Sequence, residues 1–337
     1  MKTKLYIVLL IVAACTAGCR LIDDDLSVCG TNYLINYEMR LVTEVQMTID
    51  EKLSSDIEKP IADSLKRWSD PYFSGHAHDL DMSFYSLDGT DELKHHKNDI
   101  INATQKSYTL YIPRQDYQHL AVVNIKENEE LALSGGTTSA SMHITQRTGD
   151  TIPSHGTAVY TARKEMLMAQ TDEQSFEVKL YMASCAVAMV LTNRTTAVPQ
   201  FQRMVVGGTA SGFAVKDSVF TFDTHSFIRA ERVTDDCYAA LTLPSRDSIL
   251  YTSGAPTRHA RKAAATLWEV RAYTKLPDGK ITETILSLPY PLKAGTMEII
   301  KVEVNEDGSV TVINNAEVGV AVTLDWKDGN TQELITG

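Results

Sequence analysis

Short runs of alternating apolar and polar residues, separated by tight-turn residues, constrain the fold of this 337-residue chain more than any other feature. In Thr31–Val45, for example, Tyr33, Ile35 and Tyr37 occupy every second position, which is the period of a strand with one buried face. Such runs recur roughly every 8–12 residues, and Asp-Gly or Gly-Gly pairs lie between several of them. This spacing predicts an all-β chain built of sandwiches, with few short helices.

The predicted strands extend over both halves of the sequence. They are Thr31–Val45, Leu80–Leu87, Tyr108–Ile112, His119–Ile125, Phe176–Thr192 as one or two strands, Arg203–Val206, Phe213–Phe222, Tyr238–Leu243, Ala265–Lys275, Lys280–Leu288, Met297–Asn305, Ser309–Asn314 and Val318–Trp326. One helix is predicted at Pro60, because proline suits the first helical position and Ile61, Leu65 and Trp68 then share one face.

The N-terminus has the features of a bacterial export signal. Lys2 and Lys4 precede an apolar run at Leu5–Ala14, which is too short for the ~20 residues that span a bilayer but suits a signal peptide. Two frames of small residues follow, one ending in Cys15 and the other in Cys19. Both resemble the lipoprotein signal, which is cut before the cysteine that carries the lipid. These residues alone leave both cysteines open as the lipidated one.

Charge and cysteine content limit the possible partners. The formal net charge of −11 becomes −13 when the two lysines leave with the signal, and an acidic surface argues against nucleic acid as a partner. Cys29, Cys185 and Cys237 remain besides the lipidated cysteine, so one disulfide at most can form among them. The sequence does not decide which pair forms. There is no Cys-x-x-Cys motif that would indicate a redox or zinc site.

The sequence contains no motif typical of catalysis or phosphate binding. Neither G-x-S-x-G nor H-E-x-x-H occurs. Gly207–Gly212 lacks both the Lys-Ser/Thr ending and the following helix that a phosphate loop requires, so it is interpreted as a β-turn. We therefore expect no catalytic residue, no cofactor and no enzymatic activity.

The densest group of possible metal ligands is His76, His78, Asp79 and Asp81. On a strand the two histidines would share one face and the two aspartates the other, and no third ligand is identifiable nearby. A solvated loop that enters a strand is the favoured interpretation, and no metal site is predicted. The pair His95-His96, between two lysines, is interpreted as part of a polar loop.

The segment after Cys19 resembles the opening of a known family. Asp23–Cys29 reads Asp-Asp-Asp-Leu-Ser-Val-Cys, which is similar to the element that follows the lipidated cysteine in Bacteroidales fimbrial anchor lipoproteins, the fimbrillin-like minor-fimbria anchor family. Three further segments resemble parts of that family, namely Asp81–Gly89, Tyr111–Ile125 and Ala321–Gly329. The resemblance implies that Cys19, rather than Cys15, carries the lipid.

The family implies two transthyretin-like or immunoglobulin-like β-sandwich domains in tandem. The polar stretch Gln170–Ser175 is the best boundary, which gives a signal peptide at 1–18, a lipidated tether at 19–30, an N-terminal domain at 31–172 and a C-terminal domain at 173–337. The resemblance also implies an outer-membrane lipoprotein that faces the cell exterior. Such a protein would anchor a fimbria, assist or limit its assembly, and bind shaft subunits by strand complementation.

Two other functions stay open at this point. A fimbrial shaft or tip subunit should have a trypsin-like cleavage site before a removable first strand, and the candidate Arg40 lies inside the strand pattern. A glycan-binding surface lipoprotein often exposes several aromatic residues on one face. Here Trp68, Trp268 and Trp326 all lie in helix or strand patterns that a buried core would explain.

Overall fold

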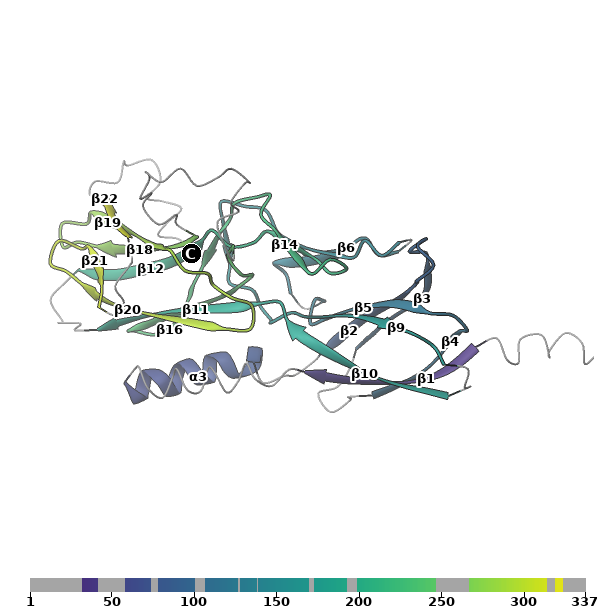
Figure 1. The fold of residues 1–337 in the computed structure, drawn as a ribbon. Coiled ribbons are helices and arrows are strands. Elements are labelled where there is room, and N and C mark those ends of the chain that lie inside the picture. Colours follow the sequence, from purple (N-terminus) through teal and green to yellow (C-terminus); the bar gives the residue numbers. More distant parts are fainter. Residues whose placement is uncertain are drawn as a thin grey trace, which may run out of the picture.

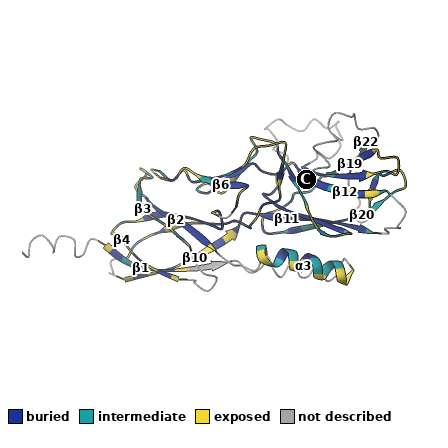
Figure 2. Cartoon of the chain, turned by 180° about the vertical axis from the view of Figure 1, so that it is seen from behind, coloured by how far each residue is buried: buried dark blue, intermediate teal, exposed yellow. Residues whose placement is uncertain are grey.

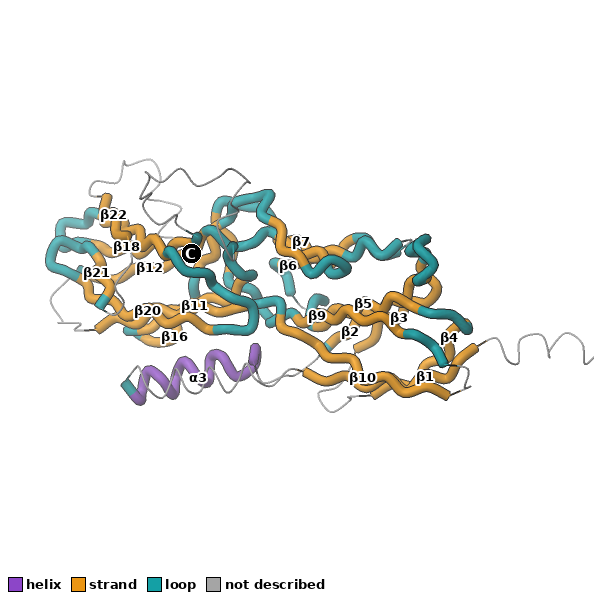
Figure 3. The backbone as a smooth tube through the Cα atoms, in the orientation of Figure 1, coloured by secondary structure: helices purple, strands orange, loops and turns teal. Residues whose placement is uncertain are grey.

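The computed structural model describes residues 32–41, 58–73, 78–100, 107–126, 128–137, 139–169, 173–192, 199–246, 267–313 and 319–323. Within these ranges the chain forms 22 strands in four sheets and one helix, α3 (Lys59–Phe73). The strands stack into an elongated, layered molecule, and α3 lies along one side of it (Figures 1 and 3). The predicted all-β fold with a sandwich-like arrangement and few helices is confirmed.

The first sheet has seven strands, which all lie within residues 32–182. Their order is β3 (Leu93–Ile100), β2 (Asp79–Ser86), β5 (Tyr117–Val123), β9 (Tyr160–Met166), β10 (Glu173–Met182), β1 (Asn32–Leu41) and β4 (Ser107–Pro113). β1 lies between β10, with which it pairs in parallel, and β4, with which it pairs antiparallel. Tyr33, Ile35 and Tyr37 of β1 point into the core, as their period of two predicts.

The second and third sheets form a sandwich in the C-terminal half. One has the order β16 (Glu231–Thr234), β17 (Cys237–Thr242), β11 (Cys185–Thr192), β20 (Met297–Val304) and β21 (Val310–Val312). The other has the order β22 (Gly319–Thr323), β19 (Ile281–Leu288), β18 (Trp268–Lys275), β12 (Gln200–Gly207), β15 (Phe227–Arg229) and β8 (Thr151–Pro153). The core between them includes Val187, Met189, Val206, Trp268 and Leu286.

The helix α3 covers the outer face of the sheet that contains β11. Leu65 is fully buried, and Ile61 and Trp68 pack beside it against β16 and β17. The side of α3 away from the sheet is exposed (Figure 2). Because α3 covers one face and the sandwich core the other, seven of the eight residues of β11 are buried. This double burial explains why the predicted strand over 176–192 is so apolar.

A fourth, small sheet joins segments from the two halves of the chain. Its order is β14 (Val219–Thr221), β13 (Gly212–Ala214), β7 (His143–Gln146) and β6 (Leu131–Ser134). Ile144 of β7 and Phe213 of β13 pack with Tyr85 and Val122 on the outer face of the first sheet. Both faces of β2 and β5 are consequently buried, and these strands do not alternate between buried and exposed positions.

Most of the predicted strands are present with shifted ends, and several strands were not predicted. The run Phe176–Thr192 forms two strands, β10 and β11, while Phe213–Phe222 is divided into β13 and β14. The interpretation of His95-His96 as a loop was wrong, because these residues lie in β3. Strands β6 to β9, β15 and β16 were also missed, and most of them are only three or four residues long.

The predicted domain boundary falls just before β10. This strand pairs with β1 and with β9, so residues 173–182 lie in the first sheet. The division at 172/173 itself stays a prediction. The predicted signal peptide, Cys15, Cys19, Cys29 and Trp326 lie outside the described residues.

The two described cysteines are too far apart to form a disulfide. Cys185 pairs with Thr242 at one end of the β11–β17 ladder, and Cys237 pairs with Val190 at the other end. They also face different cores. Burial raises the pKa of both thiols, that of Cys237 to about 12. Both thiols are free in the structure.

The described part of the chain contains no helix that is both long enough and apolar enough to cross a membrane.

Candidate functional site

The candidate site is a hollow on the outer face of β2 and β3. In β2 the even-numbered residues point into the core of the first sheet, whereas Asp81, Ser83 and Tyr85 point to the opposite side. β3 pairs antiparallel with β2, and its register places Asn98 opposite Asp81 and His96 opposite Ser83. Four polar side chains therefore meet on one face of two neighbouring strands.

A short hydrogen-bond network fixes these side chains. His96 Nε2 and Asn98 Nδ2 lie 3.1 and 3.2 Å from the same oxygen of Asp81, Oδ2, and both donate to it. Asp81 is only 7% exposed, and its other oxygen, Oδ1, is buried without a hydrogen-bond partner among the described residues. Ser83 is 1% exposed and lies near the Tyr85 hydroxyl, but its own hydroxyl makes no hydrogen bond of normal geometry.

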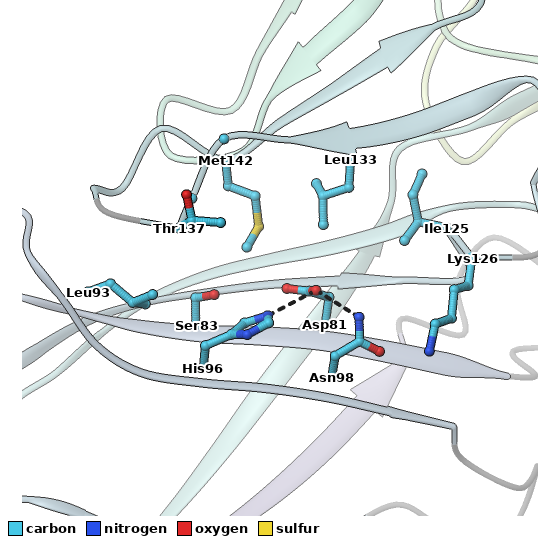
Figure 4. A pocket seen from close by; sticks show the side chains of 12 residues that line it. Asp81, Ser83, Leu93, His96, Asn98, Ile125, Lys126, Leu133, Thr137 and Met142 are labelled. Atoms are coloured by element: carbon cyan, nitrogen blue, oxygen red, sulfur yellow. Dashed lines mark hydrogen bonds and ion pairs between the residues drawn. The ribbon is translucent and has the colours of Figure 1, made fainter.

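The small sheet and the loop after β6 cover this polar floor. Leu133, Met142 and the segment Gly135–Thr137 face Asp81 and Ser83 across a space of about 530 Å³ (Figure 4). The Tyr85 hydroxyl donates to the Gly136 carbonyl at 2.8 Å and thereby ties this loop to β2. Gly136 has a φ of +79°, and a Cβ there would lie 2.8 Å from the Tyr85 hydroxyl, so only glycine allows this contact without strain.

The described residues of the group of possible metal ligands, His78, Asp79 and Asp81, have different surroundings. Asp79 accepts hydrogen bonds from the backbone N–H groups of Ile125 and Lys126 and so stabilises the turn after β5. His78 is exposed, and His76 lies outside the described residues. Among the residues described, no group of three or more His, Cys, Asp or Glu side chains could hold a metal ion. Of the described members of this group, only Asp81 lines the hollow.

His119 lies beneath the floor of the hollow, in the core of the first sheet. Its Nδ1–H donates to the Ser83 carbonyl at 3.0 Å, and its Nε2 accepts from the Tyr37 hydroxyl at 2.9 Å. The ring also stacks on Phe84, with the ring centroids 4.5 Å apart. These contacts fix the neutral ring, and burial lowers the pKa of His119 to about 3.

Gly207 ends β12 and Gly212 begins β13, and residues 208–211 connect the two strands by an irregular segment and not by the predicted β-turn. Gly208 has a φ of +78°, and Thr209 forms an isolated β-bridge with Ser245. The strand β13 follows directly at Gly212, so no helix N-terminus is available for a phosphate. The segment serves to link the sandwich to the small sheet.

Part of the chain matches a known family model. Residues 65–207 match the family model described as fimbrillin-A associated anchor proteins Mfa1 and Mfa2. No curated protein sequence matches the chain. The family match confirms the resemblance to fimbrial anchor proteins that the sequence indicated.

Several solved structures are similar to this chain at low sequence identity. A proposed polysaccharide-binding protein from Bacteroides thetaiotaomicron is 8% identical, with a TM-score of 0.50 over 85% of this chain and 97% of that one. A proposed adhesin from Bacteroides ovatus is 12% identical, with a TM-score of 0.49 over 86% and 95% of the two chains. The fimbrial anchor protein Mfa2 from Porphyromonas gingivalis is 10% identical, with a TM-score of 0.47 over 86% and 97%.

Proposed function

Starting from the match of residues 65–207 to the fimbrial anchor family, we propose that this chain anchors a fimbria to the outer membrane. Acyl chains on Cys19 hold its N-terminus in the membrane, and the folded part faces the cell exterior. There it binds a fimbrial shaft subunit and assists or limits assembly of the fimbria. The chain acts as a structural protein and not as an enzyme.

The family match is the observation that carries this proposal, and the N-terminal sequence supports it. Lys2, Lys4 and the apolar run before Cys19 suit an export signal, and Asp23–Cys29 resembles the family element that follows the lipidated cysteine. A single acyl chain binds membranes only weakly, so stable anchoring needs more than one. The several acyl chains of a bacterial lipoprotein would meet this requirement.

The position of β1 favours an anchor over a shaft subunit with a removable first strand. β1 is hydrogen-bonded on both sides, and Tyr33, Ile35 and Tyr37 are buried in the core. Removal of this strand would expose that core and leave unpaired backbone groups on β4 and β10. A protein attached to the membrane through its N-terminus is best served by a first strand that stays in place.

The C-terminal segment is the best candidate for contact with the shaft. β22 is an edge strand that pairs only with β19 in the sheet as described, and it is followed by the tail that ends at residue 337. An edge strand, or a segment donated as a strand, can pair with a neighbouring subunit through main-chain hydrogen bonds. We propose that residues 331–337 are donated to the lowest shaft subunit.

The lipid anchor is tested with two cysteine variants in cells that carry the fimbria. We expect Cys19→Ala to lose incorporation of radiolabelled palmitate and to release fimbriae into the medium. The matched control Cys15→Ala should keep both the label and the attached fimbriae, because Cys15 leaves with the signal peptide.

The reverse result, in which only Cys15→Ala loses the label, would move the lipid to Cys15. The anchoring role would be contradicted if the wild-type protein is labelled but cells that lack the protein keep fimbriae of unchanged attachment and length.

A further inference from the structure

We propose that the hollow between β2, β3 and the loop after β6 binds a single sugar residue, or another neutral polyol of that size. In this site the free oxygen of Asp81 accepts a hydrogen bond from a ligand hydroxyl. This inference is independent of the anchoring role, because it rests only on the side chains that line the hollow.

One carboxylate oxygen of Asp81 receives no hydrogen bond among the described residues. Asp81 Oδ2 receives two hydrogen bonds from His96 and Asn98, whereas Oδ1 is buried and receives none among the described residues. A buried polar group without a partner is destabilising, and more so if it is charged. Asp81 lines the hollow, and Ser83 lies on the same face of β2, two residues further on.

The charged side chains around the hollow favour a neutral ligand over an anion or a cation. The carboxylate of Asp81 would repel a phosphate or a sulfate, and Lys126 at the rim disfavours a cationic ligand (Figure 4). Too few ligating side chains gather in the described residues for a metal ion. A neutral molecule with several hydroxyl groups can both donate to Asp81 and exchange hydrogen bonds with Ser83.

The shape and the opposite wall of the hollow fit such a molecule. A volume of about 530 Å³ lies within the roughly 300–1,000 Å³ that is usual for small-molecule sites. Leu133 and Met142 form an apolar wall opposite the polar floor, as Figure 4 shows. A pyranose ring has hydroxyl groups at its edge and C–H groups on its faces, so it can contact both walls at once.

The test uses saturation-transfer NMR on the folded protein with D-glucose, D-galactose, D-mannose and N-acetyl-D-glucosamine as probes. We expect at least one of them to bind. The isosteric variant Asp81→Asn should weaken binding about tenfold, because a hydrogen bond to a charged group is lost. Ser83→Ala should weaken it severalfold without lowering the thermal stability, since the Ser83 hydroxyl makes no other hydrogen bond of normal geometry.

The matched control is Asp99→Asn on β3. Asp99 forms an ion pair with Lys97 outside the hollow, so this variant should bind the probe as the wild type does. Two results would overturn the proposal. One is that none of the four sugars binds to the folded wild-type protein, and the other is that Asp81→Asn, Ser83→Ala and the wild type bind equally well. Binding of free arginine or lysine in place of the sugars would also overturn it.

Discussion

Two histidines, His119 and His155, are fully buried and are held in the neutral form. Burial lowers the pKa of each to about 3, from an ordinary value near 6.5. His119 has partners at both ring nitrogens, whereas His155 donates from Nε2 to Gln146 and its Nδ1 has no partner among the described residues. Neither residue can take up a proton without losing a contact or burying a charge.

This burial predicts a loss of stability in acid. Between pH 6.5 and about 3 the unfolded chain binds protons at His119 and His155 that the folded chain does not, so the free energy of unfolding falls as the pH falls. At pH 5 each histidine should contribute a loss of about 2 kcal/mol relative to pH 7. Urea unfolding at the two pH values measures this loss.

The variant His155→Gln isolates one of the two contributions. Its loss of stability from pH 7 to pH 5 should be smaller than that of the wild type by about 2 kcal/mol. Between pH 7 and pH 8 the two proteins should differ by a nearly constant amount, because His155 is mostly neutral there in both the folded and the unfolded chain. An equal loss in variant and wild type from pH 7 to pH 5 would show that His155 is not neutral in the folded protein.

At the scale of secondary-structure elements, α3 and β11 depend on each other. Ala186 and Ala188 of β11 and Ala239 of β17 belong to the cluster that receives Leu65, and small residues allow a helix to approach a sheet closely. Trp68 adds a polar contact, because its indole N–H donates to Glu231 of β16 at 2.9 Å. The helix thereby joins a segment from the N-terminal half of the sequence to the C-terminal sandwich.

Truncation of Leu65 should loosen this contact. Leu65→Ala leaves a cavity between α3 and the sheet, and a loss of about 2–5 kcal/mol in the free energy of unfolding is expected. The control Arg67→Ala, on the exposed side of the same helix, should change stability by less than about 0.5 kcal/mol. Urea unfolding compares the two variants. Equal stability of both would mean that α3 contributes little to the fold.

On the scale of the whole molecule, the features that the sequence predicted are local ones. Asp88-Gly89, Asp278-Gly279 and Asp307-Gly308 end strands where predicted, because a turn depends on neighbouring residues. The candidate site depends instead on which strands pair and in which register. Asp81 and His96 are 15 residues apart, and only the register of β2 with β3 brings them together. A polar strand such as β3 has no apolar period that would reveal it.

The packing of helix and sheets into layers could not be predicted from the sequence either. The predicted helix and the apolar run over 176–192 were both recognised, but nothing in either segment indicates that α3 packs on β11 and its neighbours. The small sheet is equally hidden, because β6 and β7 come from one half of the sequence and β13 and β14 from the other. Their pairs are short and join distant residues, such as Ile144 and Phe213.

Assembly with the fimbria gives a prediction for the intact protein in cells. Deletion of residues 331–337 should abolish cofractionation with the shaft subunits, because the proposed donor segment is lost. Palmitate labelling of the truncated protein should be unchanged, which controls for export and lipidation. Unchanged cofractionation of the truncated protein would reject the donor role of the tail.

The pairing of β1 also determines how the molecule would respond to force. A pull on a fimbria anchored through Cys19 would enter the described part of the chain at Asn32, the first residue of β1, and we consider a pull directed along that strand. β1 is bound to β4 from Asn32 to Glu38 and to β10 from Leu34 to Leu41, so the load would act in shear on both ladders. In shear, the hydrogen bonds share the load and must break nearly together, whereas peeling would break them one at a time. The first strand is therefore placed to resist detachment under tension.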